Sequence, residues 1–163
     1  MKAFNVDAEA LYTAFGQTDE RSLRRRRWIA GLCAVGLADF AIIALHQTGV
    51  IRHLPDPPGR LFNSDKVTTS ARAFATGVPD GMLGAFLSAT TMLLATAART
   101  RNPERRRVFN WLLAGAAIAG AAGALDGLRD TISKQRKACV YCLAGAAINL
   151  SVLPLALKEL RRQ

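Results

Sequence analysis

The sequence contains few cysteines and few aromatic side chains. Three cysteines in 163 residues are too few for a disulfide-rich secreted scaffold. Aromatic residues make up only 7% of the chain, so platforms for stacking nucleic-acid bases are scarce. This scarcity argues against a nucleic-acid partner although the formal net charge is +10. Half of the residues are hydrophobic, which excludes intrinsic disorder.

Charge is almost absent from four long stretches, at residues 28–50, 81–98, 108–128 and 139–157. A helix needs about 20 mainly apolar residues to cross a bilayer, and all four stretches are near that length. A helix of a soluble bundle would carry a polar stripe, whereas the third stretch has no charged residue over 109–125. The pattern predicts an all-α fold, an integral membrane bundle of four helices.

The basic residues indicate how the helices are oriented. Most of the 22 lysines and arginines lie before the first stretch, between the second and third, and after the fourth. Basic residues accumulate on the cytoplasmic side, so we expect both termini there and a long outer loop over residues 51–80. The predicted organisation is a cytoplasmic segment at 1–27, a membrane domain at 28–157 and a basic tail at 158–163. The expected location is a bacterial inner membrane, in contact with lipid.

Two features of the stretches bear on packing. Gly115, Ala119, Gly123 and Gly127 recur every four residues, which predicts a ridge of small residues against a neighbouring helix. Asp39 lies midway along the first stretch, where an ionisable group is costly and usually faces the bundle interior. Two interpretations of Asp39 stay open: a functional group at a cavity, or a carboxyl held by an internal hydrogen bond.

Cys139 and Cys142 form a C-x-x-C motif, which is typical of a redox dithiol or of half a zinc site. Two further zinc ligands at suitable spacing are missing from the sequence, so no metal site is predicted. Cys33 lies inside the first stretch, where we expect a small buried hydrophobe. The pair is interpreted as a dithiol/disulfide couple, with an incidental or purely structural pair as the alternative.

The place of the motif favours thiol chemistry. The first turn of a helix presents unpaired amide groups, and Lys134, Arg136 and Lys137 precede the motif. Both features favour a thiolate. We expect Cys139 to be the more exposed sulfur, which exchanges with a partner, and Cys142 to lie one turn deeper.

Three stretches resemble the vitamin K epoxide reductase family. Residues 139–157, CVYCLAGAAINLSVLPLAL, are similar to the redox helix of that family, which begins with C-x-x-C. Residues 67–86 are similar to the family's paired hydroxyl residues, here Thr69 and Ser70, followed by a Gly-x-Pro turn before the second span. The order of spans and loops is the third similarity. The resemblance covers roughly residues 28–157.

The resemblance implies a four-helix membrane bundle around a quinone, either ubiquinone or menaquinone. Cys142 would be the sulfur beside the quinone, in a charge-transfer contact, and Cys139 the sulfur that exchanges disulfides. Ser70 or Thr69 would supply a hydroxyl near the active site, and we expect Asn149 at the quinone as well. The implied partner is a periplasmic thioredoxin-fold thiol protein.

The loop over residues 51–80 departs from the family because it has no cysteine. Family members usually carry a second cysteine pair there, and its second member would fall near Ser64. Three prolines at 55, 57 and 58 prevent a helix early in the loop, and residues 65–69 are expected to begin a short helix over the bundle mouth. Ala146, four residues after Cys142, is also smaller than the hydroxyl residue that some family members have at this position.

Two functions follow from these observations. The first is an enzyme, a quinone-coupled membrane thiol/disulfide oxidoreductase in which Cys139 exchanges directly with an external partner. The second is a redox-inactive membrane binding or scaffold protein that lost the loop-cysteine relay. A small transporter is disfavoured, because the four stretches show no inverted repeat.

Overall fold

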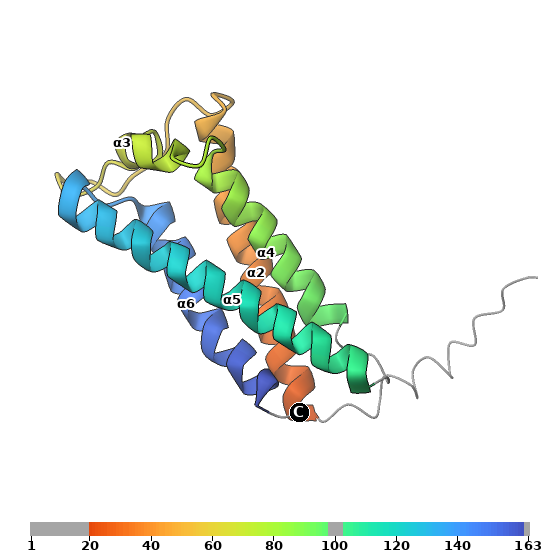
Figure 1. Cartoon of the computed structure of the whole chain (residues 1–163). Helices are drawn as coiled ribbons and strands as arrows, with labels where there is room; N and C mark the ends of the chain where they lie inside the picture. Colours follow the sequence, from red (N-terminus) through yellow and green to blue (C-terminus); the bar gives the residue numbers. More distant parts are fainter. Residues whose placement is uncertain (1–19, 98–102, 162–163) are drawn as a thin grey trace, which may run out of the picture.

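Four long helices form a bundle in the computed structural model, which describes residues 20–97 and 103–161 (Figure 1). They are α2 (Glu20–Gln47), α4 (Asp80–Ala97), α5 (Pro103–Asp130) and α6 (Val140–Leu160). All four are long and apolar enough to cross a membrane. The prediction of an all-α membrane bundle of four helices is confirmed. Most of the predicted cytoplasmic segment, residues 1–19, lies outside the described residues.

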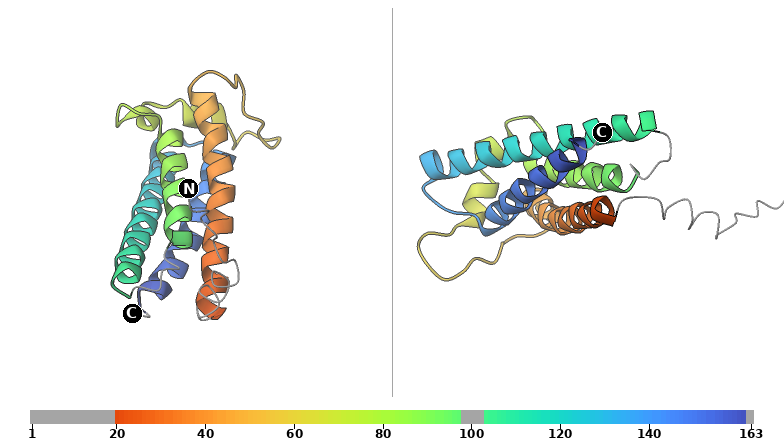
Figure 2. Two further views of the ribbon diagram at one scale, coloured as in Figure 1. Left: turned by 90° about the vertical axis from the view of Figure 1, so that its right-hand side faces the viewer. Right: turned by 90° about the horizontal axis from the view of Figure 1, so that it is seen from below.

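The helices are arranged as a ring in which each packs against two neighbours. Helix α2 packs against α4 and α6, and α5 packs against the other sides of the same two helices. Figure 2 shows the bundle from the side and along its length. We call the end with Glu20 and Leu160 the terminal end. The opposite end, which carries residues 48–79 and 131–139, is the loop end.

Glycines allow the helices to approach closely. A Cβ at Gly81 of α4 would lie 2.7 Å from the backbone nitrogen of Ala44 in α2. Phe40 of α2 is wedged between two further glycines, since a Cβ at Gly84 or Gly145 would lie within 2.8 Å of its ring. Lipid provides no hydrophobic force between helices, so such close contacts hold the bundle together.

The face of α5 that packs inward differs from the predicted one. Gly115 and Gly123 have no heavy atom within 4 Å of an added Cβ, so the predicted ridge does not pack against a helix. The prediction of the packing face was wrong, because α5 has small residues on every side and their spacing does not distinguish one face. The buried face consists of Asn110, Leu113, Ala114, Ala117, Gly120 and Ala121.

A buried ionic cluster ties three helices together at the terminal end. Glu159 of α6 is only 3% exposed and accepts hydrogen bonds from Arg25 Nε at 2.6 Å and Ser22 Oγ at 2.5 Å. Arg26 Nη2 lies 2.9 Å from Glu159 and donates to Asn110 Oδ1 of α5 at 2.7 Å. Each buried charge therefore has a partner of opposite sign, which such groups need.

The loop end is covered by the chain between α2 and α4. This segment contains helix α3 (Ser64–Thr68) and the 3-10 turn η1 (Ala71–Phe74). Asn63 caps α3 by accepting a hydrogen bond from the Lys66 amide at 2.9 Å. Helix α3 lies across the end of the bundle (Figure 1), so the expected short helix over the bundle mouth is confirmed.

Candidate active site

The two cysteines of the C-x-x-C motif form a disulfide at the start of α6. Their Cα atoms are 5.2 Å apart, a normal separation for a disulfide. Cys139 is the N-cap residue, and its Sγ accepts a hydrogen bond from the Cys142 amide at 3.1 Å. The free amides and the dipole of α6 are therefore directed at the sulfur of Cys139, which favours its thiolate once the disulfide is reduced.

Cys139 is completely buried, with 0% of its surface exposed. The prediction that Cys139 is the more exposed sulfur was therefore wrong, and Cys142 is the half-buried one. The prediction was based only on how deep each cysteine lies along the span. In the structure, the loop folds back over the start of α6 and buries Cys139. Asn63 donates to the Ala138 carbonyl at 2.9 Å, and the Ala138 amide donates to the Leu61 carbonyl at 2.8 Å.

Ser64 fixes this cover beside the disulfide. Its Oγ accepts a hydrogen bond from the Val140 amide at 3.2 Å and donates to Asp56 Oδ1 at 2.6 Å. Its own amide donates to the other carboxylate oxygen of Asp56 at 2.7 Å. Ser64 is fully buried, next to the C-x-x-C helix. It therefore occupies the site at which the resemblance places a loop cysteine.

A cavity of about 440 Å³ lies between the helices and is bordered by all four. Cys142 and Asn149 of α6 line it, together with Ser70 from the loop. Thr69 is not among the lining residues, because its exposed hydroxyl donates to the Asp65 carbonyl at 2.7 Å. The cavity thus joins three of the four predicted quinone-site residues. Its apolar wall includes Phe40, Ile43, Leu83, Leu87 and Ala146.

Small residues of α5 and α6 make room for the cavity. Gly123 lines it and has no heavy atom within 4 Å of an added Cβ, so the wall is recessed there. Ala146 of α6 also lines the cavity, with a single methyl group as its side chain. Asn149 is held in place by its Nδ2, which donates to the Gly145 carbonyl at 2.9 Å. The ridge of small residues on α5, which was predicted to pack against a helix, therefore borders the cavity.

Charged residues also line the cavity near the loop end, and none of them was predicted to belong to the site. Arg72 forms an ion pair with Asp126 of α5, and its Nη1 lies 3.9 Å from Asp80 of α4. Asp80 also accepts a hydrogen bond from Gln47 Nε2 at 2.6 Å. The only sequence signal for this group is a basic residue of the loop together with acidic residues near the ends of two spans.

Asp39 lies away from the cavity wall. Its Oδ2 is buried without a hydrogen-bond partner among the described residues, 3.1 Å from the position of an added Cβ at Gly145. An internal hydrogen bond therefore does not hold this oxygen, and Asp39 does not line the cavity. Cys33 is buried in the helix core as expected.

The comparison with protein families agrees with this arrangement. The family described as the vitamin K epoxide reductase family matches residues 27–157, which is most of the chain. The chain belongs to the vitamin K epoxide reductase family. No match to a curated protein or to a solved structure is significant. As a member of this family with four apolar helices, the chain is a multi-pass membrane protein.

Proposed function

We propose that the chain is a quinone-coupled membrane thiol/disulfide oxidoreductase. The observation that carries the proposal is the position of Cys142, which is bonded to Cys139 and also lines the cavity between the helices. One sulfur of the couple thus belongs to a residue on the cavity wall, and the other is buried beneath the loop. Membership of the vitamin K epoxide reductase family supports a redox function in the membrane.

The residues around the cavity suit a quinone. Small-molecule sites usually have volumes of about 300–1,000 Å³, with mostly apolar walls and a few polar groups, and the volume here is about 440 Å³. Phe40 and the leucines of α4 would pack on a ring, and Ser70 and Asn149 would bind its oxygens. A quinone bound here would supply an acceptor for two electrons and two protons.

The thiol step uses Cys139 as the attacked sulfur. A thiolate of the partner attacks Cys139 Sγ, the bond between the two cysteines breaks, and Cys142 leaves as a thiolate. The second thiolate of the partner then attacks the mixed disulfide and releases Cys139. The partner is oxidised to a disulfide, and the pair in α6 is reduced to a dithiol. Two electrons have entered the protein.

The reduced pair then returns to the disulfide. Cys139 and Cys142 together lose two electrons and two protons, which are the number needed to convert a quinone to a quinol. Cys142 lies on the cavity wall, so a quinone held in the cavity would take up these electrons beside its sulfur. The net reaction is partner dithiol plus quinone giving partner disulfide plus quinol.

The cover over Cys139 determines what the partner has to do. Because this sulfur is fully buried and the loop lacks cysteines, a partner reaches it only when the loop moves away from Ala138 and Val140. We propose a periplasmic thioredoxin-fold protein for this role. This assignment requires the loop end to face the periplasm of a bacterial inner membrane, as the distribution of basic residues predicts.

The thiol state in native membranes tests the proposal. A Cys33→Ala variant leaves only Cys139 and Cys142, so a gel shift with a bulky maleimide reports this pair alone. We expect the pair to be oxidised in cells that make quinone and reduced in cells depleted of quinone. A pair that stays fully reduced in both strains contradicts the proposal.

The burial of Cys139 favours a second candidate, a redox-inactive binding protein with a structural disulfide. The same experiment separates the two candidates. A structural disulfide stays oxidised whether or not quinone is present, and it resists reduction by added dithiol. A redox couple is reduced by the dithiol and is reoxidised only when quinone is added back.

A further inference from the structure

Four side chains form a continuous series of contacts from the loop-end surface to the cavity. His53 Nδ1 contacts Asp65 Oδ2, and His53 is 76% exposed. The other carboxylate oxygen of Asp65 lies 3.1 Å from His46 Nε2, and His46 is buried. His46 Nδ1 lies 3.0 Å from Thr68 Oγ1, and the buried Thr68 lines the cavity. Both histidines of the chain belong to this series.

Each member of the series can accept and release a proton. Histidine uses its two ring nitrogens separately, a carboxylate accepts at either oxygen, and a hydroxyl both donates and accepts. Thr68 Oγ1 also lies 2.8 Å from the Ser64 carbonyl, to which it donates. With that bond made, the hydroxyl accepts from His46 Nδ1–H, and it needs only to rotate to donate into the cavity.

We infer that His53, Asp65, His46 and Thr68 conduct protons between water at the loop end and the cavity. The inference rests on the proposed reaction, in which a quinone takes up two protons in the cavity. A proton enters at His53, passes through Asp65 and His46, and leaves Thr68 for a ring oxygen. An equal number of protons returns to water when the thiols of α6 form their disulfide, so protons and electrons balance.

The charged groups near the series are consistent with this role. The ionisable residues on the cavity wall are Arg72, Asp80, Asp126 and Asp130, with Cys142 added when the disulfide is reduced. Lys66 follows Asp65 on the exposed side of α3. Partial desolvation alone would raise the pKa of Asp65. The hydrogen bond from the Leu54 amide and the two histidines outweigh it and lower the pKa. Asp65 therefore remains a carboxylate, which accepts hydrogen bonds from both imidazole rings.

A pair of variants at Thr68 tests the last transfer. Thr68→Val keeps the shape of the side chain but removes the hydroxyl, whereas Thr68→Ser retains it. Reduced protein is mixed without oxygen with ubiquinone-1 or menadione, whichever oxidises the wild type, and quinol formation is followed in one turnover. Positioned proton transfer contributes about 100-fold or more, so we expect a loss of that order in Thr68→Val and in His46→Gln. Thr68→Ser should remain close to wild type.

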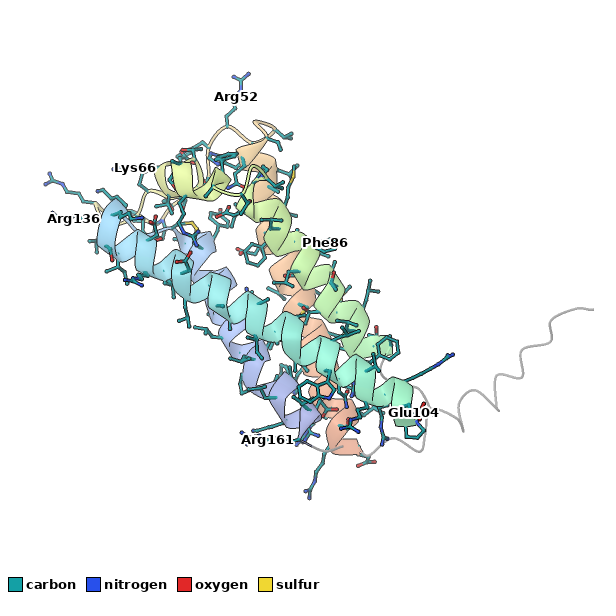
Figure 3. All side chains as sticks on the ribbon, viewed as in Figure 1. Arg52, Lys66, Phe86, Glu104, Arg136 and Arg161 are labelled. Atoms are coloured by element: carbon teal, nitrogen blue, oxygen red, sulfur yellow. A yellow bond between two sulfur atoms is a disulfide. The ribbon has the colours of Figure 1, made fainter. Side chains whose placement is uncertain are left out.

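A measurement without quinone tests the series directly. The chain has only two histidines, so ¹⁵N-histidine NMR resolves both rings, and His53→Gln assigns them. We expect the ring signals of His46 to shift as His53 titrates, and Asp65→Asn to abolish this coupling. Lys66→Gln is the matched control, since Lys66 is exposed on the same helix and lies at the loop end (Figure 3). It should preserve both the coupling and the rate.

The outcomes distinguish the two proposals. If quinone does not oxidise the wild-type thiols, the proposed function fails. If the wild type reacts but Thr68→Val and His46→Gln react equally fast, only the proton series is wrong. Independent titration of the two histidines in the wild type would also overturn the series, whatever the activity of the variants.

Discussion

The Val140 amide donates a hydrogen bond of 3.2 Å to Ser64 Oγ, which binds the loop to the first turn of α6. This contact lies beside the N-cap cysteine, Cys139, which is fully buried. Ser64 lies near the position at which the family resemblance expects a loop cysteine. We therefore expect the hydrogen bonds of Ser64 to limit access to Cys139.

Removing the Ser64 hydroxyl should expose Cys139. In Ser64→Ala, the Val140 amide loses its acceptor and Asp56 loses a donor, and an unsatisfied buried group costs about 1–3 kcal/mol. Since 1.4 kcal/mol corresponds to tenfold, we expect maleimide to alkylate Cys139 about tenfold faster in the reduced protein. Peptide mass spectrometry identifies the modified cysteine. Lys66→Ala, an exposed change in the same helix, should leave the rate unchanged, and equal rates in both variants would contradict this role of Ser64.

A thiol at position 64 should form a disulfide with Cys139. Ser64 Oγ already contacts the residue after Cys139, so the sulfur of a Ser64→Cys variant would start within reach of the N-cap. We expect non-reduced peptide mapping to show a bond between positions 64 and 139 and a free Cys142. Asn63→Cys is the control, because Asn63 is exposed on the same loop and should not pair. A bond that stays entirely between positions 139 and 142 would refute the prediction.

Two glycines should respond in opposite ways to substitution by alanine. Gly81→Ala places a Cβ 2.7 Å from the Ala44 backbone, which cannot rotate away, so we expect a loss of about 1–3 kcal/mol. Gly115→Ala meets no atom within 4 Å and gains helix propensity of up to about 1 kcal/mol. Thermal unfolding in detergent should show a lower midpoint for the first and an unchanged or higher midpoint for the second. Equal midpoints would show that α2 and α4 do not pack closely at Gly81.

The ionic cluster at the terminal end should be sensitive to loss of its carboxylate. Glu159→Ala leaves the buried Arg26 without its counter-ion, and breaking a buried pair in this way costs about 3–5 kcal/mol. The neighbouring Lys158 is exposed, so Lys158→Ala should have little effect. Unfolding midpoints of the two variants measure the difference. A small effect of Glu159→Ala would mean that water enters the cluster.

The contribution of Asp65 to stability should be lost in acid. Desolvation raises its pKa, but the Leu54 amide and the two histidines more than compensate, so the folded-state pKa lies below the ordinary value of about 3.9. The stabilisation is therefore complete above that value and disappears as the pH falls through the folded-state pKa. We expect the difference in unfolding midpoint between wild type and Asp65→Asn to be maintained above about pH 5 and to shrink below about pH 4. A difference that grows on acidification would reverse the assigned direction.

The sequence predicted the four membrane helices because long apolar runs have few alternatives in lipid. It also predicted that Cys139 and Cys142 act as a couple, and the structure shows the two bonded to each other. The face on which α5 packs was not predictable. Glycine and alanine surround that helix, and only the shape of the neighbouring helices selects the side with Gly120.

The site was predictable only in part. Cys142, Ser70 and Asn149 line one cavity, whereas their binding of a quinone stays a prediction. Thr68 is the last residue of the short helix α3, and Thr69 is its C-cap. The orientation of that helix decides that the side chain of Thr68, and not that of Thr69, lines the cavity. No sequence motif links His46 and His53, and only the position of Asp65 between them creates a series.

The sequence by itself determined that the chain is a four-helix membrane protein with a thiol pair at one end of its last span. Composition and spacing suffice for that, since they act within single segments. The tertiary structure decided that Cys139 is covered and that Thr68 lies on the cavity wall. Both depend on contacts between residues far apart in the chain, where a loop without regular structure folds over a helix end, and no local pattern encodes such a contact.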